Sequence, residues 1–180
     1  MIKSKFVSII KTVRYAMKGI AYAMKNERNM RIHLVSAIGV MVFSTFFNMS
    51  AVEYTILVLT ISLVMMSEMF NSAIEGLIDL CAKEYNTTAK AAKDIAAGGV
   101  LIVAMAAVVV GCILFSKKEA YISMWVFFCM NPLMGILGLF LLVIGYLYVF
   151  WGPTEIKNKL HVLIRKAKHR ISDTDNLGGK

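Results

Sequence analysis

The stretch VEYTILVLTISLVMM (residues 52–66) is predominantly apolar, and SEMFNSAIEGLID (residues 67–79) follows it directly. On a helix of 3.6 residues per turn, Glu68 and Glu75 lie on one face, about 10 Å apart. Asn71, Ser72 and Asp79 fall on or beside the same stripe. Ionisable groups in or at the edge of a membrane helix are costly, and by default they are candidates for function. The stretch therefore predicts a membrane helix whose polar end carries metal or proton chemistry. The alternative is a polar clamp between helices.

Apolar residues make up 58% of the 180-residue chain. A soluble domain of this size has too little interior to hide so much apolar surface. The apolar residues also occur in blocks close to the roughly 20 residues that a membrane span requires. We predict an all-α membrane protein with spans at about 32–48, 52–70, 95–115 and 124–151.

Residues 3–26 form a different kind of segment, in which apolar and basic residues alternate at helical spacing. Such a helix lies in the membrane interface, with its apolar side in the bilayer and its lysines near anionic lipid. We predict a surface helix here. The alternative is a soluble helix packed on a partner.

The net charge of +9 is unevenly distributed along the chain. Residues 1–31 carry eight Lys or Arg and one acid, the 48–53 loop carries no Lys or Arg, and seven Lys or Arg follow residue 151. Cytoplasmic loops are enriched in Lys and Arg, so both termini and the 82–94 loop are predicted to face the cytoplasm in a multi-pass protein of the cell membrane. No nucleic-acid-binding motif accompanies the charge, and no nucleic-acid partner is predicted.

This topology gathers polar residues from separate elements on the cytoplasmic side. Carboxylates can hold a Mg²⁺ that keeps waters and takes its other ligands from phosphates. A lysine near a helix start, such as Lys93, can contact a phosphate as a point charge. A further, partly desolvated carboxylate can act as a general base. Together these groups predict phosphoryl transfer to an alcohol in the membrane. The gathered residues are Glu27, Glu68, Glu75, Asp79, Glu84, Lys93 and Asp94.

Three motifs support this interpretation: NERNMRIH (residues 26–33), the Glu68–Asp79 stretch, and AKAAKDIAAG (residues 89–98). In this order and spacing they resemble the signatures of the small bacterial membrane diacylglycerol kinase/undecaprenol kinase family. The resemblance covers roughly residues 5–116. It divides the chain into a lipid kinase domain, 1–118, and an extension, 119–180.

The resemblance implies a homotrimer that shares its sites between subunits, each with a surface helix and three spans. It implies transfer from ATP, with Mg²⁺, to a lipid alcohol. By position Glu68 would be the general base, contacting the lipid together with Asn71, while Glu27 and Glu75 would hold the metal. The residues that the resemblance assigns to the bound nucleotide and its metal are Tyr15, Glu27, Glu75, Glu84, Tyr85, Asn86, Lys93 and Asp94.

The substrate is less directly indicated. Diacylglycerol-type members have Arg, His and Ser where this chain has Ser8, Asn86 and Ala97. The motifs are more similar to the undecaprenol kinase branch, which predicts conversion of undecaprenol to undecaprenyl phosphate. The alternatives are phosphorylation of diacylglycerol to phosphatidic acid, and a non-catalytic conduit or assembly protein that uses the carboxylates as a relay.

The extension beyond residue 118 has no counterpart in the basic members of this family. We predict that it holds a fourth span at about 124–151, which Asn131-Pro132 can kink, and a basic cytoplasmic tail. A membrane anchor or a lipid-facing cover is the expected role.

Overall fold

The computed structural model describes residues 2–82 and 84–152. Within them the chain forms six helices and no strand, which confirms the all-α class. The predicted basic tail lies outside the described residues. The helices are α1 (Ile2–Asn26), α2 (Arg28–Ser44), α3 (Ala51–Cys81), α4 (Thr87–Leu114), α5 (Lys118–Met130) and a last helix, Pro132–Gly152.

Three of these helices, α3, α4 and Pro132–Gly152, are long and apolar enough to cross a membrane. Their large apolar side chains are widely exposed, as expected where lipid takes the place of water. The span expected at 32–48 corresponds to α2, which begins earlier, at Arg28, and has 17 residues. The chain is a membrane protein.

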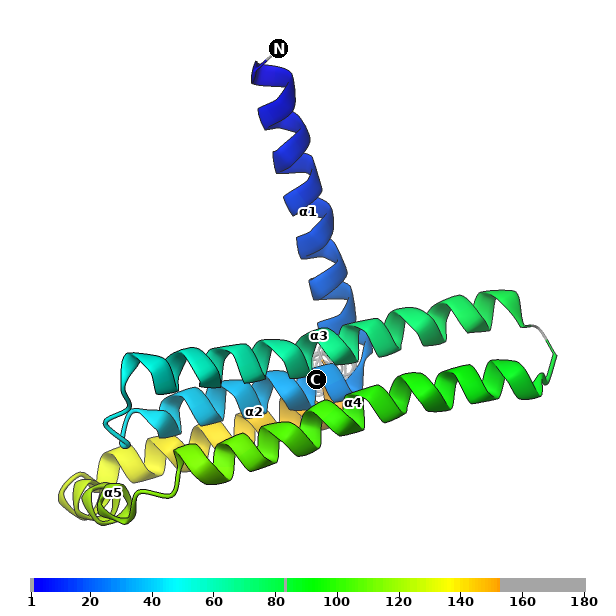
Figure 1. Cartoon of the computed structure of the whole chain (residues 1–180). Helices are drawn as coiled ribbons and strands as arrows, with labels where there is room; N and C mark the ends of the chain where they lie inside the picture. Colours follow the sequence, from blue (N-terminus) through cyan, green and yellow to red (C-terminus); the bar gives the residue numbers. More distant parts are fainter. Residues whose placement is uncertain (1, 83, 153–180) are drawn as a thin grey trace, which may run out of the picture.

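Figure 1 shows α2, α3, α4 and the last helix running side by side, while α1 leaves the bundle steeply near the middle of α3. α3 packs chiefly on α4, and it also contacts α2 and α1. Its 31 residues extend over about 46 Å, more than the roughly 30 Å of a bilayer core. The end of α3 and the start of α4 therefore form a hairpin that projects beyond α1.

The opposite end of the bundle is closed by a helix cap and an ion pair. The Ser50 side chain accepts from the Glu53 amide at 3.3 Å, and the Ser50 amide donates to the Glu53 carboxylate at 2.7 Å. Glu53 also pairs with Lys117 at 2.8 Å, which joins the start of α3 to the α4–α5 connection. Phe43, Phe47 and other aromatic rings cluster at this end.

The single span expected at 124–151 is two helices in the structure. α5 lies across the end of the bundle, and Pro132–Gly152 runs back beside α2 (Figure 1). Proline removes an amide donor and disfavours helical geometry in the residue before it, so α5 ends at Met130 and Asn131 is non-helical. Pro132 then stands at the first position of the next helix, where its missing donor costs little.

Candidate active site

Glu68 lies at the level where α1 meets α2, and its side chain is only 3% exposed although it is a carboxylate. The Asn29 side chain hydrogen-bonds to it, and Glu27, His33 and Glu75 lie close enough to interact with it electrostatically. Glu27 is the non-helical residue between α1 and α2, and it stands at the N-cap position of α2. Asn29 and His33 lie on one face of α2 because they are four residues apart. The structure therefore brings α2, α3 and the α1–α2 junction together around one buried carboxylate.

Asn71 is one helical turn beyond Glu68 and is 7% exposed. Its amide nitrogen donates to Glu75 Oε1 at 2.8 Å, which fixes the orientation of the amide. Within the part of the chain that the structure describes, its Oδ1 is buried without a hydrogen-bond partner. A buried acceptor without a partner costs on the order of 1–3 kcal/mol, so this oxygen is suited to a donor that a ligand brings.

The two carboxylates expected to hold Mg²⁺, Glu27 and Glu75, both lie near Glu68. Among residues 2–82 and 84–152, no group of three or more His, Cys, Asp or Glu is placed to hold a metal alone. Mg²⁺ does not need such a cage, because it commonly takes one or two carboxylates together with phosphates and waters. The oxygen donors present, with the unpaired Asn71 Oδ1 nearby, fit a magnesium ion that arrives with a nucleotide.

Lys93 of α4 forms an ion pair with Asp79 of α3, one turn beyond Glu75. The pair is on the projecting part of the hairpin, and both side chains are partly exposed. Lys93 is therefore near the carboxylates, with its ammonium group held by Asp79.

Most of the other predicted site residues lie on the hairpin, at or near its projecting end. Glu84, Tyr85 and Asn86 lie at the tip of the hairpin, about 20 Å from Glu68 along α3. Tyr85 is 81% exposed, and Asn86 caps α4 by accepting from the Thr88 and Ala89 amides. Asp94 is exposed in α4 beside Lys93.

Tyr15 is also remote from the carboxylates. It is exposed on α1, about 17 Å along that helix from its end, and the Lys18 ammonium lies 5.8 Å from the centre of its ring. Its contact with a nucleotide stays a prediction.

Sequence reasoning assigned no catalytic role to Asn29 or His33. Both belong to the NERNMRIH motif, and their i, i+4 spacing was the available signal that they share a face. That spacing does not tell which helix this face of α2 contacts. In the structure the face lies toward Glu68 of α3.

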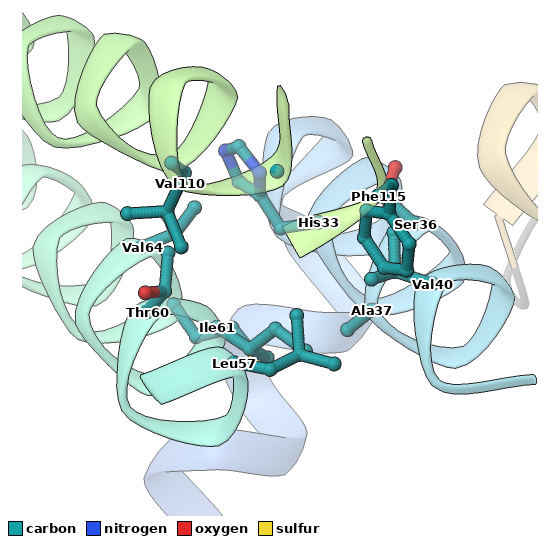
Figure 2. Close-up of a pocket in the computed structure, with 13 residues that line it drawn as sticks. His33, Ser36, Ala37, Val40, Leu57, Thr60, Ile61, Val64, Val110 and Phe115 are labelled. Atoms are coloured by element: carbon teal, nitrogen blue, oxygen red, sulfur yellow. The ribbon is translucent and has the colours of Figure 1, made fainter. Parts of the chain in front are cut away.

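A cavity of about 270 Å³ opens between α2, α3 and α4. Figure 2 shows His33 and Ser36 of α2, Thr60 and Val64 of α3, and Val110 of α4 around it. Val64 lies one turn before Glu68, so the cavity begins beside the buried carboxylate and continues into the apolar bundle. A hydrocarbon chain attached to a polar head at Glu68 would find an apolar environment here.

Comparison with known proteins agrees with this geometry. The chain matches the prokaryotic diacylglycerol kinase family over residues 14–115, more than half of its length. It is 40% identical over 109 residues to a diacylglycerol kinase of Synechocystis sp., covering 59% of this chain and 62% of that protein. The matched part thus spans less than two thirds of that relative.

Two further relatives are matched over most of their length. An undecaprenol kinase of Bacillus subtilis is 33% identical over 108 residues, which is 60% of this chain and 88% of the relative. A diacylglycerol kinase of Escherichia coli is 35% identical over 109 residues, which is 61% of this chain and 89% of that relative. The fold and these matches define the class as membrane-embedded lipid kinases. The chain belongs to the prokaryotic diacylglycerol kinase family.

Proposed function

We propose that the protein transfers a phosphoryl group from ATP to undecaprenol, forming undecaprenyl phosphate at the cytoplasmic face of the cell membrane. The observation that carries the proposal is the burial of Glu68 beside Asn29 and His33. Both residues belong to the motif that resembles the undecaprenol kinase branch, and they lie where the acceptor hydroxyl would meet its base.

Glu68 is the group that would take the proton from the lipid alcohol. Its carboxylate is shielded from bulk water, and the Asn29 side chain orients it by a hydrogen bond. Asn71 Oδ1 is one turn away and has no other partner among the described residues, so it can accept from a hydroxyl or an ordered water in the site. Holding the alcohol between these groups accounts for both positioning and proton removal.

Glu27 and Glu75 would hold Mg²⁺, and Lys93 would contact the phosphates. When bound, Mg-ATP supplies the phosphoryl group and the metal neutralises charge on the phosphate oxygens. Lys93 can exchange its Asp79 partner for a phosphate because both side chains remain accessible to water.

The family resemblance and the exposed α1 support a homotrimer with shared sites. α1 projects away from its own bundle (Figure 1), and Tyr15 is exposed on it about 17 Å along the helix from the α1–α2 junction. We place α1 on the cytoplasmic surface, and a neighbouring subunit would then bring Tyr15 and the hairpin tips toward the carboxylates.

The substrate proposal predicts that purified protein in mixed micelles, with labelled ATP and Mg²⁺, phosphorylates undecaprenol faster than diacylglycerol. Relatives named diacylglycerol kinase at 40% and 35% identity favour diacylglycerol as the second candidate. Label should be followed into both lipids at matched mole fractions. Equal rates, or faster labelling of diacylglycerol, would refute the choice of undecaprenol.

Lys93→Met is expected to raise the KM for Mg-ATP by about tenfold to 100-fold, since it removes a charge-assisted hydrogen bond to phosphate. The lipid KM should stay unchanged. Asp79→Asn is the matched control, because it breaks the same ion pair but leaves the lysine free for phosphate. Steady-state kinetics with each substrate varied separates the two variants. An equal rise in KM for both would mean that the ion pair itself matters, and not a phosphate contact.

A further inference from the structure

The last helix, Pro132–Gly152, contacts α2 through two arginines near its C-terminal end. Arg31 of α2 is only 8% exposed, and its Nε donates to the Val149 carbonyl at 3.3 Å. Its Nη1 donates to the Lys25 carbonyl in the last turn of α1 at 3.1 Å. One buried guanidinium therefore joins three helices. The neighbouring Arg28 adds a second contact, with its guanidinium 4.5 Å from the centre of the Phe150 ring.

Two glycines allow this close approach. A Cβ at Gly145 would be 3.0 Å from Val35 Cγ1, so a larger residue would force the last helix away from α2. A Cβ at Gly152 would be 3.2 Å from Arg31 Cζ, and Gly152 also has a φ of +59°, which side-chain-bearing residues rarely adopt. The absence of a side chain at Gly152 thus leaves room for the Arg31 guanidinium.

Away from this end the two helices are loosely packed. An apolar groove of about 720 Å³ separates α2 from the last helix and α5, and Gly138 lines it. A Cβ at Gly138 would meet nothing within 4 Å. The close approaches at Gly145 and Gly152 lie toward the end that holds Arg31, the same end as the carboxylates, and the groove extends from Gly138 to Gly145 beside them.

Arg31 binds the α1–α2 junction, and this junction carries Glu27 and Asn29, two residues that lie near Glu68. Glu27 lies two residues after Lys25, whose carbonyl Arg31 binds, and Asn29 lies two residues before Arg31. The break between α1 and α2 at Glu27 is non-helical, so the helices alone do not determine how it is held.

We infer that the last helix is a positioning element of the kinase site: through Arg31 it holds the α1–α2 junction so that Glu27 and Asn29 face Glu68. This inference rests on the proposed function for its catalytic meaning, but the holding of the junction can be measured without turnover. Arg31 acts through other residues and is a positioning residue, since it contacts neither substrate in this arrangement.

The test compares Gly145→Leu with Gly138→Leu in the full chain, two identical changes on one helix. Hydrogen exchange of the amides of residues 26–33 should be about tenfold faster in Gly145→Leu, because local opening becomes easier. In Gly138→Leu it should match the unaltered protein. The kcat/KM for Mg-ATP should fall about tenfold in Gly145→Leu, since Glu27 and Asn29 are displaced from Glu68.

A milder pair covers the case in which Gly145→Leu does not fold. Gly145→Ala should produce the same changes more weakly, and adding Val35→Ala should reverse them because it removes the atom that the new methyl group meets. Unaltered exchange of residues 26–33 in both Gly145 variants would overturn the inference. If residues 26–33 exchange faster in the Gly145 variants but the unaltered protein phosphorylates no lipid, the inference is supported and the proposed function is refuted.

Discussion

Glu68→Gln is expected to lower the rate of lipid phosphorylation by about 10²–10⁴-fold, the usual contribution of a general base. The amide keeps the size and most of the hydrogen bonds of the carboxylate but cannot take the proton of the alcohol. Binding of Mg-ATP should change little, because Glu68 is assigned to the acceptor and not to the metal. The measurement is turnover at saturating lipid and Mg-ATP, with nucleotide binding followed separately by calorimetry.

Glu53→Gln provides the matched control for Glu68→Gln. It is the same chemical change in the same helix, but Glu53 lies at the opposite end of α3, in contact with Lys117 and Ser50. It should lower the thermal stability modestly and leave turnover within about threefold, as expected for a surface pair. If Glu68→Gln kept more than a tenth of the activity, Glu68 would not be the base.

Glu75→Gln is expected to weaken binding of Mg-ATP by at least about tenfold, or 1.4 kcal/mol, because it removes one anionic ligand of the metal. The amide oxygen of glutamine can still accept from Asn71 Nδ2, which now contacts Glu75 Oε1 at 2.8 Å. The change therefore tests the charge of Glu75 more than its hydrogen bond. Titration of Mg²⁺ at fixed ATP measures the effect.

Glu119→Gln in the first turn of α5 is the control for this second change, because it removes an equal charge at the far end of the bundle. It should bind Mg-ATP as the unaltered protein does. Normal Mg-ATP affinity in Glu75→Gln would remove Glu75 from the metal site, and Glu27 alone would then have to supply the carboxylate.

The sequence was sufficient for the fold class and for the central feature of the site. The seven-residue spacing of Glu68 and Glu75 placed both on one stripe, and the structure puts both near Glu27, a residue 41 positions earlier than Glu68. The predicted topology gives a reason for this proximity, because residues on one side of a membrane are confined to a thin layer. Lys93 was predicted in the same layer, but the sequence did not show that it pairs with Asp79.

Other features depend on contacts that spacing does not report. The predicted span ends near residue 70, yet α3 continues to Cys81, and in this last part Asp79 forms an ion pair with Lys93 of α4. Asn131-Pro132 was expected to kink a single span. Whether the helix after Pro132 continues in the direction of α5 or runs back beside α2 depends on its packing against α2. Arg31 was one basic residue among eight in the first 31, and only the position of Val149 shows why it is buried.

The bond between Arg31 and Val149 joins residues 118 positions apart, and this separation has a consequence for biosynthesis. At about 5–20 residues per second, a ribosome makes Val149 roughly 6–24 seconds after Arg31. Until then the guanidinium has no such carbonyl, and the segment around Glu27 is not secured. A chain whose translation stops before Val149 would lack this bond, so we expect its α1–α2 junction to be held less firmly than in the finished chain.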